Sequence, residues 1–220
     1  MLFEDRIDAG RRLAATLAAY RSRRPVVLAL PRGGVPVAAE IARSLAAPLD
    51  LLLVRKIGLP GHSELAIGAV VDGAAPLIVR NEALIRSAHV GEEAFQHVCR
   101  DELAEIERRR TRYLGGRTPV PVAGRVAIVV DDGIATGATV KAALRALRRR
   151  EPAELVLAVP VAPAEAVAAL RREVDALVCL ATPEPFGAIG RFYEDFGQLS
   201  DAEVIAILAQ FPAEARPPET

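Results

Sequence analysis

The segment with the clearest chemistry is residues 126–139, where two adjacent carboxylates precede a loop framed by glycines. The apolar run Val126–Val130 has the length and the β-branched content of a fully buried strand. Asp131 and Asp132 come where that strand should end, and a helical pattern follows over residues 140–150. A loop that opens into a helix presents unpaired backbone N–H groups and the positive end of the helix dipole. Together these features favour the binding of a phosphate.

The two carboxylates cannot favour that same phosphate, so they must serve another group nearby. Ionised carboxylates only accept hydrogen bonds, and the vicinal hydroxyls of a ribose offer two donors, so the pattern describes a ribose 5-phosphate. A Walker motif needs Gly-Lys-Ser/Thr, whereas Gly137 is followed by Ala138, and a dinucleotide motif needs three spaced glycines. Asp-Asp-Gly is also a common turn and Thr-Gly-Ala-Thr could merely cap a helix. The whole string in this order favours a binding site over those simpler explanations.

The string DDGIATGAT at residues 131–139 resembles the phosphoribosyl pyrophosphate (PRPP) binding signature of type I phosphoribosyltransferases. LPRGGV at residues 30–35 resembles the pyrophosphate loop of the same family. RKIG at residues 55–58 and FYEDF at residues 192–196 further resemble a bacterial branch whose substrate is undefined. The resemblance extends over roughly residues 3–205.

This resemblance implies a set of site residues. Arg32, with the amides of Gly33 and Gly34, supplies donors for the pyrophosphate, and Arg55 and Lys56 are candidates for further contacts. Family members hold the pyrophosphate loop in a cis peptide. The predicted catalytic residues are Asp131, Asp132, Arg32 and Lys56. The predicted substrate-binding residues are Arg32, Gly33, Gly34, Arg55, Lys56, Asp131, Asp132, Gly133, Ile134, Ala135, Thr136, Gly137, Ala138, Thr139, Phe192 and Tyr193.

Mg²⁺ is the expected cofactor, because PRPP is highly charged and Mg²⁺ suits phosphate and hydroxyl oxygens. No dedicated protein metal site is predicted; in the family the ion is carried by PRPP, near Asp131 and Asp132. One departure concerns the acceptor. The hypoxanthine-guanine branch has an aspartate where this chain has Ala135, so 6-oxopurine chemistry does not carry over with its usual base. Glu64 is a candidate substitute, although an exposed loop glutamate is more often simply solvated.

The acceptor should be held by a C-terminal hood that contains Phe192 and Tyr193. Aromatic rings of this kind suit stacking on a flat base. A small satellite core under the edge of the sheet explains the same residues equally well. The arginine runs at residues 108–110 and 148–150 fall at helix C-termini, where cations are favoured, and are interpreted as solvated helix ends.

Apolar strands that alternate with helical segments predict an α/β fold with a doubly wound, mainly parallel sheet, a helical insertion and a small hood. Ligands of such sheets bind beyond the carboxyl ends of the strands, and both candidate loops follow a strand. The predicted organisation is an N-terminal helix at 1–24, a PRPP-binding α/β core at 25–182 with its insertion at about 82–116, a C-terminal hood and helix at 183–211, and a frayed tail at 212–220.

Two expectations concern single elements. Ser200 is the predicted N-cap of the last helix, at residues 201–210. Residues 57–68 have the composition of a loop, which we hypothesise to be mobile without ligand and to close over PRPP to exclude water. An idle surface loop is the simpler alternative. The residues behind this interpretation are Gly58, Pro60, Gly61 and Gly68.

Composition narrows the class of protein. The chain has 220 residues, enough for one sizeable domain, and its two cysteines have no metal-like spacing. Lys plus Arg number 28, as do Asp plus Glu, so no charge excess indicates nucleic acid or a membrane as partner. The expected location is the cytoplasm, the expected partners are PRPP and a small-molecule acceptor, and a homodimer is also expected.

The leading prediction is therefore a transferase that joins ribose 5-phosphate from PRPP to a nitrogenous acceptor, most simply a nucleobase, with release of pyrophosphate. One alternative is a non-catalytic regulator that senses PRPP or a nucleotide. Another is an enzyme that uses PRPP on an acceptor that is not a base.

Overall fold

A five-stranded parallel sheet forms the core of the computed structural model, which describes residues 2–59, 62–72 and 76–211. The strand order is β2-β1-β6-β7-β8, and every neighbouring pair is parallel. The strands β1 and β6 are buried along their whole length, as unbroken apolar runs predict. The five strands are β1 (Val26–Ala29), β2 (Leu49–Leu51), β6 (Val126–Val130), β7 (Glu154–Val161) and β8 (Ala176–Ala181).

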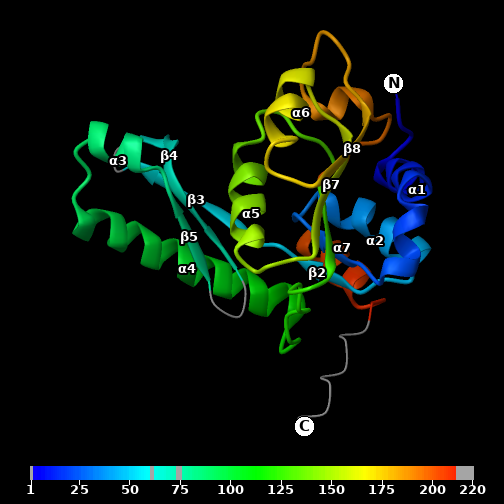
Figure 1. Ribbon diagram of the computed structural model, residues 1–220, viewed down its shortest axis with the longest axis horizontal. Coiled ribbons are helices and arrows are strands. Elements are labelled where there is room, and N and C mark those ends of the chain that lie inside the picture. Colours follow the sequence, from blue (N-terminus) through cyan, green and yellow to red (C-terminus); the bar gives the residue numbers. More distant parts are fainter. Residues whose placement is uncertain (1, 60–61, 73–75, 212–220) are drawn as a thin grey trace.

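Helices cover both faces of this sheet, so the predicted doubly wound fold is confirmed (Figure 1). The helices α1, α2 and α7 lie on one face, and α5 and α6 lie on the other. A short 3₁₀ turn, Ala18–Arg23, follows α1 where one longer helix was expected. The five helices are α1 (Arg6–Thr16), α2 (Gly34–Leu45), α5 (Ala138–Arg148), α6 (Ala164–Leu170) and α7 (Asp201–Leu208).

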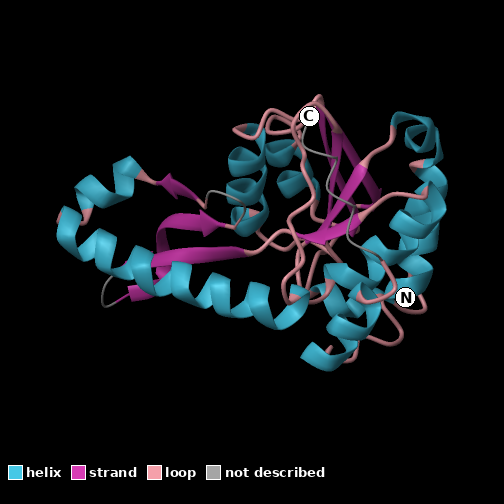
Figure 2. Ribbon diagram, turned by 90° about the horizontal axis from the view of Figure 1, so that it is seen from below, coloured by secondary structure: helices cyan, strands magenta, loops and turns pink. Residues whose placement is uncertain are grey.

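An arm extends from this core, and it consists of a three-stranded antiparallel sheet with α4 packed along it (Figure 2). The helical insertion predicted at about 82–116 therefore packs on a sheet that is formed by the residues before it. A short helix, α3, connects the sheet to α4. The elements of the arm are β3 (Val54–Leu59), β4 (His62–Val71), β5 (Leu77–Arg80), α3 (Glu82–Ser87) and α4 (Glu92–Leu114).

The expectation of a loop at residues 57–68 was wrong, because its described residues belong to β3 and β4. Ile57 and Ile67 are fully buried in the same core as α4. Gly68 permits a close approach of backbone: an added Cβ would lie 2.6 Å from the carbonyl oxygen of Val79 on β5. Gly68 is therefore needed for the close approach of two strands, and it does not indicate a loop. Two residues behind the expectation, Pro60 and Gly61, lie outside the described residues.

The N-terminal segment meets residues 192–195 of the predicted hood beside β7. Phe3 bridges to Tyr193 in a short parallel pairing, and the amide of Glu194 donates to the carbonyl of Phe3 at 2.9 Å. Phe3 and Tyr193 pack with Ala9 and Val161 in a small separate core. The 3₁₀ turn Ile189–Phe192 precedes this contact. The N-terminal segment and the predicted hood therefore form one layer.

The start of α7 agrees with its prediction. Ser200 accepts from the amide of Glu203, and the Glu203 side chain accepts in return from the amide of Ser200. This reciprocal pair is a capping box, which fixes where the helix begins.

We predict that Ile57→Ala lowers the free energy of unfolding by about 2–5 kcal/mol, because it leaves a cavity in a packed core. Leu65→Ala is the matched control, since Leu65 lies on β4 with 50% of its surface exposed. Urea denaturation of both variants measures the difference. Equal, small effects would show that the arm does not share the core of the protein.

Candidate functional site

The two loops predicted to bind ligand lie side by side at the carboxyl edge of the core sheet. They follow β1 and β6, which are adjacent and parallel. The amide of Leu30 donates to the carbonyl of Val130 at 2.9 Å, and a Cβ added to Gly34 would lie 2.7 Å from the same oxygen. Strand pairing thus brings residues 30–35 against the start of residues 131–139. Ligands of doubly wound sheets bind at this edge.

Asp132 packs directly against Gly33. A Cβ added to Gly33 would lie 2.0 Å from Oδ2 of Asp132, so only hydrogen fits there. The peptide between Pro31 and Arg32 is cis, as the resemblance implied. The side chain of Asp132 is held in a buried position, and the requirement for glycine at position 33 follows from that carboxylate.

A guanidinium that the sequence did not indicate also contacts Asp132. Nε of Arg6, in the first turn of α1, donates to Oδ2 of Asp132 at 2.8 Å, and each side chain is only 12% exposed. Nη1 of Arg6 donates to the carbonyl of Gly197 at 2.9 Å, and its guanidinium carbon lies 3.9 Å from the ring centroid of Phe196. A lone arginine in an N-terminal helix has no sequence signature, so only the fold reveals it.

Tyr193 contacts the backbone of Asp132. Its hydroxyl donates to the carbonyl oxygen of Asp132 at 2.5 Å. The ring is 2% exposed and stacks on Phe196 at 4.9 Å between centroids. The prediction that Tyr193 stacks on a base was therefore wrong, and the satellite core explains it. Phe192 is half-buried against Phe186 at 5.1 Å, and its stacking on a ligand stays a prediction.

Asp131 lies beside the buried carboxylate of Asp132. Its Oδ1 accepts from the amide of Asp132 at 2.9 Å. Burial, and then the negative charge of Asp132, raise the pKa of Asp131 above the usual range of an aspartate. Asp131 is consequently the member of the pair that gains most when a hydrogen-bond donor or a cation approaches.

Asp131 lines a small cavity of about 90 Å³ together with Pro31, Arg55, Arg109 and Thr139. The structure therefore brings residues of both loops together with Arg55, whose role in binding stays a prediction. Nε of Arg55 also pairs with Glu102 of α4 at 2.5 Å. The interpretation of arginines 108–110 as a solvated helix end was wrong for Arg109, which faces this cavity. It was also wrong for Arg110, whose Nη1 lies 2.6 Å from the buried Asp72.

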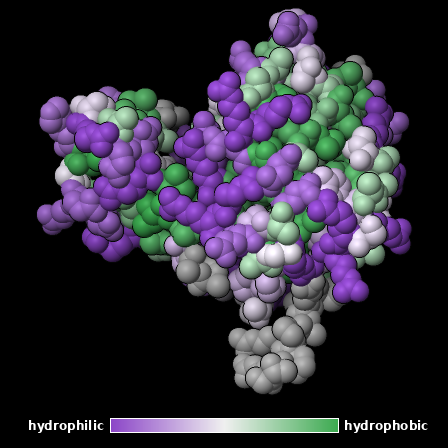
Figure 3. Space-filling model, viewed as in Figure 1, coloured by the Kyte–Doolittle hydropathy of each residue, from purple (hydrophilic) through white to green (hydrophobic). Residues whose placement is uncertain are grey.

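The side chains of Arg32 and Lys56, two cations predicted to bind the ligand, do not line this cavity. Nη1 of Arg32 lies 3.7 Å from Oδ1 of Asp201, which also accepts from the hydroxyl of Tyr113 at 2.5 Å. Lys56 is exposed and lines a groove between the arm and α5, together with Thr139 and Lys141. Figure 3 shows the surface hollowed between the arm and the core, with hydrophilic side chains gathered along it.

The loop before α5 presents an open helix N-terminus. Gly137 is the N-cap residue, with φ of 75° and no capping side chain. Ala135, Thr136, Ala138 and Thr139 are exposed in front of it.

Two backbone amides that were expected to bind the ligand already donate hydrogen bonds within the protein. The amide of Ile134 donates to the carbonyl of Val161 at 2.9 Å, and that of Gly34 donates to Leu30 at 3.0 Å. These two N–H groups are satisfied within the protein, so the prediction that they bind the ligand's phosphates was wrong.

Among the residues that the structure describes, no group of three or more His, Cys, Asp or Glu residues is placed to hold a metal ion. No described helix combines the length and apolar character that crossing a membrane requires. The side chain of Glu64, the candidate base, lies outside the described residues.

The fold and the two loops define a class of protein. Residues 3–189 match the family described as "Phosphoribosyl transferase domain", and the chain belongs to this family. It is 50% identical over 207 residues to a protein of Mycobacterium tuberculosis (strain CDC 1551 / Oshkosh) named "Putative phosphoribosyl transferase MT0597". The match covers 94% of this chain and 46% of that relative, so the chain spans about half of its length. "Putative phosphoribosyl transferase Rv0571c" of strain ATCC 25618 / H37Rv gives the same figures.

A solved structure is similar along nearly the whole chain. The crystal structure of TT1426 from Thermus thermophilus superposes with a TM-score of 0.84 at 40% sequence identity. The match covers 96% of this chain and 99% of that one, so it includes the arm as well as the core.

We predict that Gly33→Ala lowers the free energy of unfolding by about 1–3 kcal/mol, because the new methyl group must displace the carboxylate of Asp132 or the loop itself. Gly116→Ala is the control, since an added Cβ there meets nothing within 4 Å. Urea denaturation compares the two. If Gly33→Ala matched the control, the loop and the carboxylate would not be in contact.

The raised pKa of Asp131 predicts an effect of Asp131→Asn that depends on pH. A carboxyl whose pKa is higher in the folded chain stabilises the fold while protonated, and this contribution is lost as the pH rises through the folded-state pKa. Asparagine does not ionise, so the stability of the variant relative to the wild type should increase as the pH rises above about 4, the ordinary pKa of an aspartate. A tenfold preference of the folded chain for the protonated form corresponds to about 1.4 kcal/mol. Urea unfolding at a series of pH values above that point measures it, and a difference that stays constant with pH would contradict the assignment.

Proposed function

We propose that the chain transfers ribose 5-phosphate from PRPP to a nitrogenous acceptor and releases pyrophosphate. The observation that carries this proposal is the contact between Gly33 and Asp132, which joins a donor loop to a carboxylate pair. A further support is the uncapped start of α5, which follows the same carboxylates after one short loop. PRPP needs these three features together, because it has a pyrophosphate, a diol and a 5′-phosphate.

The reaction is a displacement at C1′ of the ribose. The bond from C1′ to the pyrophosphate oxygen breaks, and the electron pair leaves with the pyrophosphate. A bond forms from C1′ to the acceptor nitrogen, which loses its proton. Positive charge develops on the sugar, and fixed carboxylates such as Asp131 and Asp132 stabilise such charge. Their ionised oxygens also accept from the 2′ and 3′ hydroxyls.

Each anionic part of PRPP has a candidate partner in this arrangement. The amide of Gly33 and the guanidinium of Arg55 lie on the side of the pyrophosphate loop. Thr136, Thr139 and the open N-terminus of α5 suit the 5′-phosphate. Arg32 and Lys56 carry cations on long side chains near the rim, where ordering on ligand binding brings them inward.

Mg²⁺ fits the oxygens that remain. Oδ2 of Asp132 is engaged by Arg6, and Oδ1 of Asp131 accepts from the amide of Asp132. The side chains of Asp131 and Asp132 also interact with each other, and a divalent cation would relieve the repulsion between their charges. Two hard oxygens suit an ion whose other ligands are water and PRPP, and the ion supplies charge neutralisation on the leaving pyrophosphate.

A nucleobase is the simplest acceptor class. Ala135 offers no carboxylate to take a proton from the acceptor, so a base that is nucleophilic without such help fits better than a 6-oxopurine. The rival function is a regulator that binds PRPP or a nucleotide without turnover. Such a regulator would bind PRPP through the same contacts but would not catalyse the transfer.

We predict that the purified chain releases pyrophosphate when it is incubated with PRPP, Mg²⁺ and a panel of bases and amines. The double variant Asp131→Asn, Asp132→Asn should lose about 10²–10³ in rate, because fixed charge opposite the developing cation is removed. Asp101→Asn is the control, since its side chain is 69% exposed on α4.

Calorimetric PRPP binding by the same three proteins separates the two functions. Binding without pyrophosphate release across the panel would establish the regulator in place of the enzyme. If the folded double variant bound and turned over PRPP as the wild type does, the assignment of Asp131 and Asp132 to the PRPP site would be wrong.

A further inference from the structure

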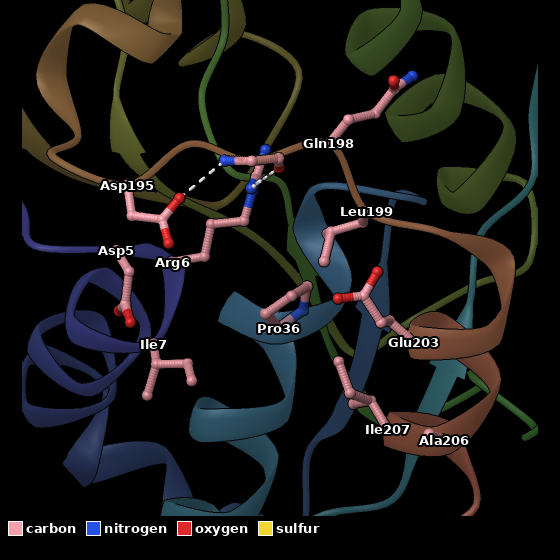
Figure 4. Close-up of a pocket in the computed structure, with 11 residues that line it drawn as sticks. Asp5, Arg6, Ile7, Pro36, Asp195, Gln198, Leu199, Glu203, Ala206 and Ile207 are labelled. Atoms are coloured by element: carbon pink, nitrogen blue, oxygen red, sulfur yellow. Dashed lines mark hydrogen bonds between the residues drawn. The ribbon is translucent and has the colours of Figure 1, made fainter.

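Arg6, at the start of α1, is held by the protein on three sides. Its Nε donates to Oδ2 of Asp132 at 2.8 Å, and its Nη1 donates to the carbonyl of Gly197 at 2.9 Å. The guanidinium lies over the ring of Phe196, 3.9 Å from the ring centroid. Figure 4 shows it reaching from α1 to Gly197, whose amide in turn donates to Asp195. Because a guanidinium is planar, two directed bonds and a covered face fix its orientation before any ligand arrives.

The fold also fixes the start of α1, from which this side chain extends. Asp5 caps the helix by accepting from the amide of Asp8 at 2.8 Å. A Cβ added to Gly10 would lie 2.8 Å from the carbonyl oxygen of Val37, so α1 packs closely on α2. Arg6 lies between the cap and this contact, and rigid packing therefore presents its guanidinium to the acidic loop.

The bond from Arg6 constrains the carboxylate of Asp132. Oδ2, which accepts that bond, also lies against Gly33, where an added Cβ would be 2.0 Å away. The adjacent Asp131 carries a second carboxylate, and like charges on neighbouring side chains repel. A cation on Oδ2 offsets that repulsion, so Asp132 keeps its direction beside Asp131 and does not turn away from it.

A ribose diol requires acceptors that are held in this way. The 2′ and 3′ hydroxyls sit on neighbouring carbons of one ring, so their acceptors must keep a fixed spacing and direction. A site built to accept from a hydroxyl discriminates against the analogue that lacks it. A carboxylate that can rotate away exchanges the sugar hydroxyl for water, and the discrimination is lost.

We propose, on the basis of the proposed function, that Arg6 is a positioning residue that holds Asp132 toward the diol and so makes the site select ribose phosphates over 2-deoxyribose phosphates. Arg6 acts through Asp132 and not on the sugar, because two of its nitrogens are already engaged within the protein. A lysine at this position could supply the charge, but it could not supply two bonds in the fixed geometry of a guanidinium.

Arg12 provides a matched control on the same helix. It pairs with Asp8 at 2.7 Å, donates to the carbonyl of Leu2 at 3.1 Å and lies over the ring of Phe3. Arg12 thus makes the same three kinds of contact as Arg6, with a carboxylate, a carbonyl and an aromatic ring. Its carboxylate partner lies on α1, so Arg12→Met removes the same chemistry without affecting the acidic loop.

The test compares binding of ribose 5-phosphate with binding of 2-deoxyribose 5-phosphate, measured by calorimetry in the presence of Mg²⁺. The wild type and Arg12→Met should prefer the ribose compound by about tenfold, the contribution of one hydrogen bond to a charged group. Arg6→Met should reduce this preference to about twofold or less, while both sugars still bind through their phosphate. Arg6→Lys should give an intermediate preference, since it keeps the charge and loses the fixed geometry.

Loss of one partner of a buried ion pair also destabilises a protein, so urea denaturation accompanies the binding measurements. If Arg6→Met does not fold, Arg6→Lys decides the outcome. A general loosening of the structure would weaken both sugars by the same factor, so an unchanged preference in a folded Arg6 variant overturns the proposal. A wild type that binds both sugars equally, or neither, overturns it too. Failure of the wild type to bind PRPP, measured alongside, is a separate result that overturns the proposed function itself.

Discussion

Three distant parts of the chain converge on one residue, Asp132, and its contacts hold them together. Gly33 lies against it, Arg6 pairs with it, and the hydroxyl of Tyr193 donates to its carbonyl. A carboxylate that is removed from water needs a cation and hydrogen-bond donors, or it protonates. Arg6 supplies that cation to Asp132, and burial and the charge of Asp132 raise the pKa of Asp131. The pair thus divides into Asp132, which holds the structure together, and Asp131, which lines a small cavity.

The same arrangement explains why the N-terminal segment packs against the hood. Arg6 and Tyr193 are 126 and 61 residues away from Asp132 in sequence. Each contributes one polar contact to Asp132 and one apolar surface, through Phe196 and Phe3 respectively. Phe196 and Phe3 thus seat this arginine and this tyrosine, and Tyr193, which sequence reasoning assigned to a ligand, is part of that packing.

The central fold and the acidic loop could be predicted from the sequence because their signals are local. The apolar run of β6, the two aspartates and the glycines lie within fourteen consecutive positions, residues 126–139. Arg6 and Arg109 could not be predicted, since each is a single charged residue on a helix whose partner is set by tertiary packing. Gly68 was misread for a related reason: glycine composition cannot distinguish a loop from a strand that another backbone approaches closely.

The amides of Ile134 and Gly34 show a second limit of local reasoning. A motif indicates which groups lie near a ligand, but it does not indicate which of them are already satisfied by the protein. Backbone N–H groups are obligatory donors, and partners such as the carbonyl of Val161 are contributed by strands elsewhere in the sheet. Counting free donors requires the whole fold.

The helix α4 has a mechanical consequence. Its 23 residues span about 35 Å, and a helix is stiff over that length. Its first turn is tied to β5, at the far end of the arm, through Glu92 and Arg80, at 2.9 Å. Its last turn is tied through Tyr113 to Asp201, which contacts Arg32 in the pyrophosphate loop. The helix therefore acts as a strut, and the far end of the arm and the loop cannot shift independently unless one of these bonds breaks.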